Sequence, residues 1–185
     1  FIFSKNSPSS LGESTVRNRP HSLGSRSDNP APGTVCSSKR ISRTWLRCWN
    51  RRARASGFCY LNDAVIAINW LLERGRRVAY LDLDAHHGDG VQEGFYADDQ
   101  VLTVSLHESG VYFFPGTDFE DETGTGRGQG YTVNLPLLAH TDDPLYMRAF
   151  DEVVYPLLAA FNPDIIVAQI GADAFRTDPL TRLEI

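Results

Sequence analysis

The residues best suited to chemistry lie in one short stretch from Asp82 to Gly90, which contains three acids and two histidines. Asp84 and His86 stand two residues apart, so in extended backbone their side chains point the same way. A further acid, Asp173, follows another apolar stretch far along the chain. Two carboxylates and one imidazole leave one position of a tetrahedral site open, where a catalytic zinc ion can hold water. We therefore expect an Asp/His/Asp set that binds zinc or a similar ion.

Two alternatives without a catalytic metal compete with this interpretation. In the first, the stretch from Asp82 to Glu93 is a calcium-binding EF-hand loop, with acids or a histidine at the first, third, fifth and twelfth positions. This alternative is weak because His87 stands where the loop requires glycine and no helix is predicted before it. In the second, the stretch is a polar loop whose acids cap a helix.

Alternating strands and helices are expected to position these residues. Apolar runs typical of buried strands cover residues 77–84, 101–106, 131–137 and 164–170, and helical spacing of apolar residues covers 64–73, 91–97 and 142–161. This alternation predicts βαβ units, and hence an α/β fold with a parallel sheet and flanking helices. In such sheets ligands bind beyond the carboxyl ends of the strands. Three of these ends carry polar residues, at Asp82 to Asp84, at Ser105 to His107 and at Asp173.

Charge and composition divide the chain at about residue 55. Residues 1–54 carry eleven Lys and Arg against two acids, whereas residues 55–185 carry seven Arg against twenty-one acids. The first segment is rich in Ser and has little hydrophobic periodicity, so it cannot bury enough apolar area to offset its ordering entropy. We expect residues 1–54 to be a basic arm, disordered or foreign to the fold, and residues 55–185 to form a partial catalytic domain. The arm has no aromatic interleaving or nucleic-acid motif, so nucleic acid is not expected as a partner except through these residues.

The composition excludes several classes of protein. With 42% hydrophobic residues, the chain of 185 residues can form a packed core and is not disordered throughout. No apolar run approaches the ~18–20 residues that cross a bilayer, so no membrane association is expected. Cys36, Cys48 and Cys59 form no Cys-x-x-Cys pair, which disfavours a disulfide framework or a zinc knuckle. We expect a reducing compartment, the cytoplasm, or the nucleus if the source is eukaryotic.

Four motifs that follow in order from about Ala55 to the last residue resemble the zinc-dependent histone deacetylase superfamily. They are Gly57–Asp63 (GFCYLND), Asp82–Gln92 (DLDAHHGDGVQ), Ser105–Glu108 (SLHE) with Phe113–Thr117 (FFPGT), and Gly171–Asp173 (GAD). The sequence from Ser105 to Gly110 (SLHESG) is similar to that of bacterial acetoin-utilisation-type members. The resemblance implies an arginase/deacetylase-type fold and an enzyme that removes acetyl groups from N-acetyl-lysine, in histones or other proteins, or from a related small acetamide.

The resemblance also implies roles for individual residues. Asp84, His86 and Asp173 would bind zinc. Phe58 and Phe114 would flank the tunnel for the acylated side chain, and Gly57 would line it. Potassium or sodium would bind at two further sites. The first matches Asp82, Asp84, His86, Ser105 and Leu106, and the second matches Phe95, Asp98, Val101 and Tyr131.

The chain departs from the family pattern in the groups that handle protons. In the family, a tandem His shortly before the Gly-Phe-Cys-Tyr stretch is the base, and a Tyr near a later Gly-rich loop steadies the oxyanion. Residues 43–52 contain no His, and the sequence ends at Ile185. Asp82 and Asp89 match the acids that orient the missing His pair. We expect a deacetylase fragment, truncated at both ends, with impaired activity. The alternatives are a non-catalytic module that binds metal or acetyl-lysine, and a nucleic-acid-associated protein that acts through the arm.

Overall fold

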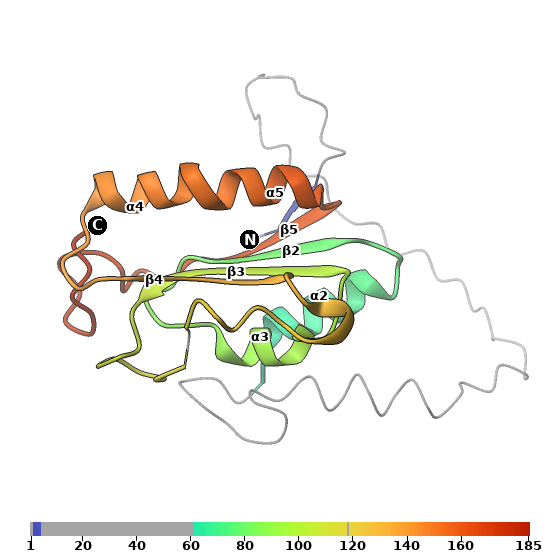
Figure 1. The fold of residues 1–185 in the computed structure, drawn as a ribbon, viewed down its shortest axis with the longest axis horizontal. Coiled ribbons are helices and arrows are strands. Elements are labelled where there is room, and N and C mark those ends of the chain that lie inside the picture. Colours follow the sequence, from blue (N-terminus) through green and yellow to red (C-terminus); the bar gives the residue numbers. More distant parts are fainter. Residues whose placement is uncertain (1, 5–60, 118) are drawn as a thin grey trace, which may run out of the picture.

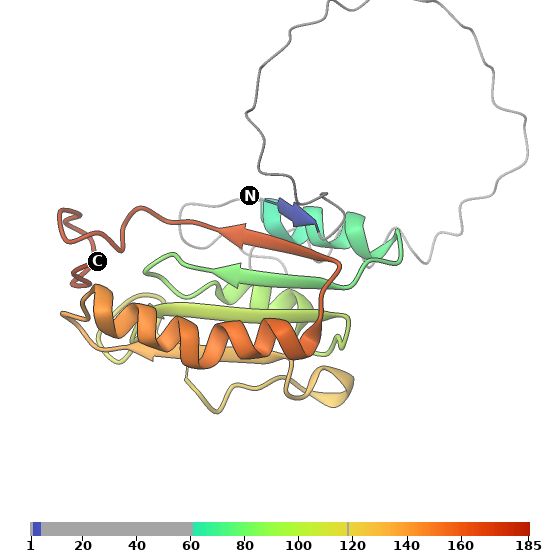
Figure 2. The ribbon, with the colours of Figure 1, turned by 90° about the horizontal axis from the view of Figure 1, so that it is seen from above.

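The computed structural model describes residues 2–4, 61–117 and 119–185. At its centre lies a five-stranded sheet in the order β1-β5-β2-β3-β4 (Figures 1 and 2). The strands are β1 (Ile2–Ser4), β2 (Val78–Asp82), β3 (Val101–Glu108), β4 (Thr132–Leu137) and β5 (Ile165–Gln169). Strands β5, β2, β3 and β4 run parallel to one another. The parallel sheet predicted from the sequence is confirmed.

Strand β1 is antiparallel to its neighbour β5. Ile2 pairs with Val167 and Ser4 with Ile165. These residues belong to the segment expected to be a basic arm. The edge of a sheet offers unpaired N–H and C=O groups, and an apolar segment such as the start of this chain can pair with them. The expectation for residues 5–54 lies outside the described residues.

Helices cover both faces of the sheet (Figure 1). On one face lie α2 (Asp63–Leu72) and α3 (Asp89–Phe95). On the other lies one continuous rod made of α4 (Asp143–Ala149), the π-helical stretch η3 (Phe150–Val154) and α5 (Tyr155–Phe161). A short 3₁₀ turn, η2 (Gly126–Gly128), precedes β4. Within the described part of the chain, no helix combines the length and the apolar composition needed to cross a membrane.

The helices begin and end at residues whose chemistry explains the boundaries. The side chain of Asn62 accepts a hydrogen bond from the Val65 N–H at 3.0 Å and caps α2. The side chain of Asp142 caps α4 in the same way at 3.2 Å, from the N–H of Leu145. Helix α5 stops at Asn162, which has a positive φ of 54° and precedes a proline that cannot continue the helix.

Two hydrophobic layers hold the sheet between the helices. Ala79 and Leu81 face the long rod, where they pack with a cluster that includes Phe161. Val78 and Tyr80 face α2 and α3, since successive strand residues point to opposite faces. Strands β2 and β3 are buried along their whole length. Their carboxyl ends are therefore held firmly at one rim of the sheet.

Candidate metal centre

Asp84, His86 and Asp173 come together at the carboxyl rim of the sheet. Each offers a ligand atom, and these atoms lie within 4.8 Å of one another. His86 Nδ1 lies 2.7 Å from Asp173 Oδ2 and 3.2 Å from Asp84 Oδ1. The first two residues follow β2 and the third follows β5, and these strands are parallel neighbours. The fold thus brings together the three residues predicted to bind zinc.

A bend, and not an extended strand, orients the first two residues. Strand β2 ends at Asp82, so Asp84 and His86 lie beyond the strand. The extended backbone expected from the sequence is therefore not what turns their side chains to one side. The Asp84 N–H donates to Asp82 Oδ1 at 3.1 Å, and the His86 N–H donates to Asp84 Oδ1 at 2.8 Å. These hydrogen bonds fold the side chains back toward the rim. Since a strand precedes the stretch, the EF-hand alternative is wrong.

Gly171 lets the carboxylates of Asp84 and Asp173 pack closely against the backbone. A Cβ atom at this position would lie 2.6 Å from Asp84 Cγ and 2.8 Å from Asp173 Oδ1. Such contacts are far inside van der Waals distance, so a side chain here would displace the ligand groups. The two carboxylates and the imidazole that meet beside Gly171 are ligand types that zinc and similar divalent ions bind.

The charges of the centre depend on one another. Burial opposes the ionisation of Asp84, but the hydrogen bonds from His86 hold the pKa of its carboxyl below the usual value. The hydrogen bond with Asp84 raises the pKa of the His86 imidazole, against burial and with help from Asp173. One cationic group between two carboxylates is therefore favoured at this point.

Two phenylalanines stand against His86. The ring of Phe113 stacks on the imidazole, with centroids 4.5 Å apart and planes 26° apart. Phe114 lies edge-on at 6.4 Å and is 55% exposed. Sequence reasoning named Phe114 and missed Phe113, although the two are adjacent. Gly57 and Phe58, the other predicted tunnel residues, lie outside the described residues.

Asp82 lies behind the ligands at the end of β2, where it is buried. It accepts a hydrogen bond from the Tyr80 hydroxyl at 2.7 Å and supports the backbone of Asp84. Burial raises the pKa of Asp82 to about 7. Asp89, the other acid matched to a missing His pair, is the first residue of α3.

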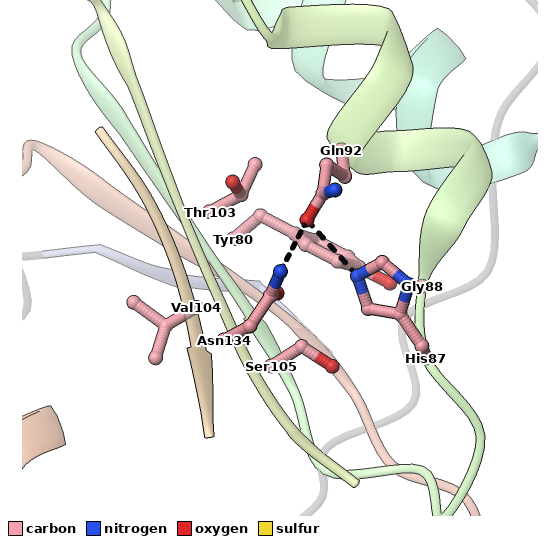
Figure 3. A pocket seen from close by; sticks show the side chains of 8 residues that line it. All are labelled: Tyr80, His87, Gly88, Gln92, Thr103, Val104, Ser105 and Asn134. Atoms are coloured by element: carbon pink, nitrogen blue, oxygen red, sulfur yellow. Dashed lines mark hydrogen bonds between the residues drawn. The ribbon is translucent and has the colours of Figure 1, made fainter. Parts of the chain in front are cut away.

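A buried polar network joins His87 to Gln92 and Asn134 (Figure 3) and extends to the loop that carries the phenylalanines. His87 Nε2 lies 2.9 Å from Gln92 Oε1, which also accepts from Asn134 Nδ2 at 3.0 Å. His87 Nδ1 lies 3.2 Å from Thr117 Oγ1, and Gln92 Nε2 donates to Glu122 at 2.5 Å. Burial lowers the pKa of His87, so a neutral ring that donates from Nε2 and accepts at Nδ1 fits both contacts.

This network surrounds a small pocket. It is lined by Tyr80, His87, Gly88, Gln92, Thr103, Val104, Ser105 and Asn134 (Figure 3). Sequence reasoning missed Gln92 and Asn134. The available signal was the presence of amides within an otherwise apolar helix face and strand.

The residues matched to monovalent-cation sites lie beside the end of β2 and around the start of β3. Ser105 pairs with Asp82 in the sheet and Leu106 follows it, so the first set surrounds the end of β2. At the start of β3, Asp98 N–H donates to the Phe95 carbonyl at 2.9 Å, just before Val101. The Tyr131 carbonyl accepts from the N–H of a β3 residue at 2.9 Å.

Comparison with known proteins agrees with the motif assignment. The histone deacetylase domain matches residues 50–185. The chain is 50% identical over 131 residues to a probable deacetylase of Archaeoglobus fulgidus, covering 70% of this chain and 36% of that protein. It is 49% identical over 133 residues to the acetoin utilization protein AcuC of Bacillus subtilis, covering 71% and 34%.

A solved structure shows the same likeness. It is the acetylpolyamine aminohydrolase of Burkholderia pseudomallei, with a TM-score of 0.70 and 43% identity, which covers 73% of this chain and 40% of that chain. The chain thus spans about a third of the length of these curated relatives.

Proposed function

Because the chain belongs to the histone deacetylase domain family, we propose that its metal centre serves the hydrolysis of an acetylated amine. The substrate class is N-acetyl-lysine in a histone or another protein, or a smaller acetylated amine such as the one named in the Burkholderia aminohydrolase. The observation that carries this proposal is the convergence of Asp84, His86 and Asp173 beside Gly171, where a side chain would clash with both carboxylates. Zinc is the ion that we propose for the centre.

The residues of this chain would bind and orient the reacting groups. A bound zinc ion would polarise the acetyl carbonyl and lower the pKa of a water molecule. Two backbone N–H groups hold the carboxylates for this role. The Asp84 carboxylate accepts from the His86 N–H at 2.8 Å, and the Asp173 carboxylate accepts from the Ala85 N–H at 3.0 Å. The stacked ring of Phe113 fixes the plane of the His86 imidazole. The exposed ring of Phe114 offers an apolar surface for the methylene stem of an acylated amine.

Hydrolysis also needs a base and a donor to the oxyanion. Each described histidine is engaged elsewhere: His86 faces the carboxylates, His87 contacts Gln92, His107 is buried beside Ser105, and His140 pairs with Glu184. Residues 43–52, where the family carries its base, lie outside the described residues and contain no His. A base contributes about 10²–10⁴-fold. We therefore propose that this chain binds zinc but turns over acetamides slowly.

The proposal is tested by measuring zinc content and turnover of the same protein. We expect one zinc ion per chain by elemental analysis, and a loss of at least tenfold in zinc affinity in Asp173→Ala. The matched control is Asp151→Ala, which removes an exposed acid from η3 and should leave zinc binding unchanged. Unchanged zinc affinity in Asp173→Ala would contradict the metal centre.

Turnover is measured with a fluorogenic acetyl-lysine peptide and an acetylated polyamine, beside a complete family member. We expect slow turnover that depends on zinc and on Asp173. A rate within tenfold of the complete enzyme would show that the residues that move protons have been misassigned.

A further inference from the structure

Among the described residues, Arg182 from the last part of the chain holds a buried carboxylate at the end of β3. Glu108 is 1% exposed. Its Oε1 accepts from Arg182 Nε at 2.8 Å and lies 2.6 Å from Nη2 in an ion pair, and its Oε2 accepts from the Arg182 backbone N–H at 2.7 Å. The Arg182 carbonyl in turn accepts from the His140 N–H at 2.7 Å. Arg182 is thus fixed through its side chain, its amide and its carbonyl.

Two routes connect this ion pair to the proposed ligand Asp173. In the first, the Glu108 N–H donates to the Ala85 carbonyl at 2.9 Å, and the Ala85 N–H donates to Asp173 Oδ1 at 3.0 Å. In the second, Thr181, the residue before Arg182, donates its hydroxyl to the Asp173 carbonyl at 2.5 Å. The carboxylate and the backbone of Asp173 are both tied to Glu108 and its partner.

The segment between Asp173 and Arg182 contains no helix or strand that could hold the ligand by itself. A buried carboxylate costs free energy unless it is paired, and even a paired one seldom stabilises a fold more than apolar residues would. Groups that hydrogen-bond to a metal ligand, in contrast, commonly change metal affinity by about 10–100-fold. The position of the pair beside Asp173 therefore favours a role in the centre over a role in stability alone.

We propose that Glu108 and Arg182 are positioning residues that hold Asp173 in its metal-binding geometry. This inference rests on the proposed function, because it needs the metal centre. The pair would act on zinc affinity through Ala85 and Thr181, without touching the ion or the substrate.

The test is the zinc affinity of the whole chain, measured with zinc alone in competition with a chromogenic chelator. We expect Arg182→Met to weaken zinc binding tenfold or more and Thr181→Val to weaken it severalfold. Arg182→Lys, which keeps a charge near Glu108, should recover part of the loss. The matched control is Arg148→Met, which removes an exposed ion pair with Glu152 on the long rod and should leave the affinity unchanged.

A double-mutant cycle separates a shared role from a general loss of stability. If the pair acts as a unit, Glu108→Gln combined with Arg182→Met weakens zinc binding no more than Arg182→Met alone. Additive losses, or unchanged zinc affinity in both Arg182→Met and Thr181→Val, would overturn the inference. If the melting curve shows that Arg182→Met does not fold, the zinc affinities of Thr181→Val and Glu108→Gln test the inference instead.

The two proposals fail in different ways. A wild-type chain that binds no zinc, or an Asp173→Ala variant that binds it normally, contradicts the metal centre and with it the positioning role. Zinc binding that needs Asp173 but is indifferent to Thr181 and Arg182 contradicts the positioning role alone.

Discussion

A methyl group at Gly171 is the most direct steric perturbation of the metal centre. The Cβ of Gly171→Ala would lie 2.6 Å from Asp84 Cγ and 2.8 Å from Asp173 Oδ1. Carbon atoms pack best at about 3.5 Å, so the Asp84 carboxylate must move by roughly 0.9 Å. Neither carboxylate can swing away freely, since Asp84 accepts from the His86 N–H and Asp173 from the Ala85 N–H.

The expected effect on zinc binding is large because metal sites tolerate little displacement. Ligand distances in protein metal sites hold to within about 0.2 Å, several times less than the required shift. We expect the zinc affinity of Gly171→Ala to fall by at least ~100-fold, which corresponds to about 2.8 kcal/mol. Without metal, the crowding should lower the free energy of unfolding by about 1–3 kcal/mol.

Chelator competition gives the affinity, and urea unfolding in EDTA gives the stability of the metal-free chain. The matched control is Gly94→Ala in α3, whose Cβ would meet Val65 Cγ2 at an ordinary 3.4 Å. Alanine is the better helix former by up to about 1 kcal/mol, so this control should be neutral or stabilising. A Gly171→Ala protein with zinc affinity within threefold of the wild type would refute the arrangement of Asp84 and Asp173 around this glycine.

Three further predictions concern the surroundings of the centre. Gln92→Leu removes an amide that is hydrogen-bonded to three polar side chains. Urea unfolding should show a loss of about 2–4 kcal/mol in the free energy of unfolding, and a loss below about 0.5 kcal/mol would contradict the network. Burial raises the pKa of Tyr146 to about 12. The folded chain therefore keeps this proton longer than the unfolded chain, and the stability that it contributes is complete below pH ~10 and lost as the pH rises to ~12. In Tyr146→Phe, the free energy of unfolding should therefore change less between pH ~10 and ~12 than in the wild type. An unchanged slope over this pH range would count against the raised pKa of Tyr146. Potassium or sodium should raise the melting temperature relative to a bulky organic cation, because backbone oxygens near Asp82 and Ser105 suit a hard cation, and equal melting temperatures in all three would exclude the site.

The strands and helices could be predicted closely because they follow apolar periodicity and common capping residues. Two strand ends differ from the prediction by two residues each: β2, expected to run to residue 84, ends at Asp82, and β3, expected to stop at residue 106, continues to Glu108. His107 and Glu108 are fully buried polar residues, and a hydrophobicity pattern excludes such residues from a core strand. The partner that makes Glu108 tolerable is Arg182, 74 residues later, which local sequence cannot indicate.

The family and the meeting of Asp84, His86 and Asp173 could be predicted because their motifs are short and stand at strand ends. Family membership is confirmed by the match over residues 50–185. The role of these residues as zinc ligands stays a prediction. The contacts of Phe113 could not be predicted, because its position against His86 depends on how a long loop folds over the rim.

The places where the apolar strand pattern breaks are the places that build the centre. Strand β2 ends in the buried acid Asp82 and β3 in the buried acid Glu108, and a core selected for stability alone would carry apolar residues there. Each acid is satisfied from a neighbouring residue or segment, by the Tyr80 hydroxyl in one case and by Arg182 in the other. Each residue also holds a backbone group of the loop after β2: the Asp82 carboxylate accepts from the Asp84 N–H, and the Glu108 backbone N–H donates to the Ala85 carbonyl. The geometry of a centre made of loop residues is therefore set by the rigid interior of the sheet, at a cost in stability that binding a metal ion would offset.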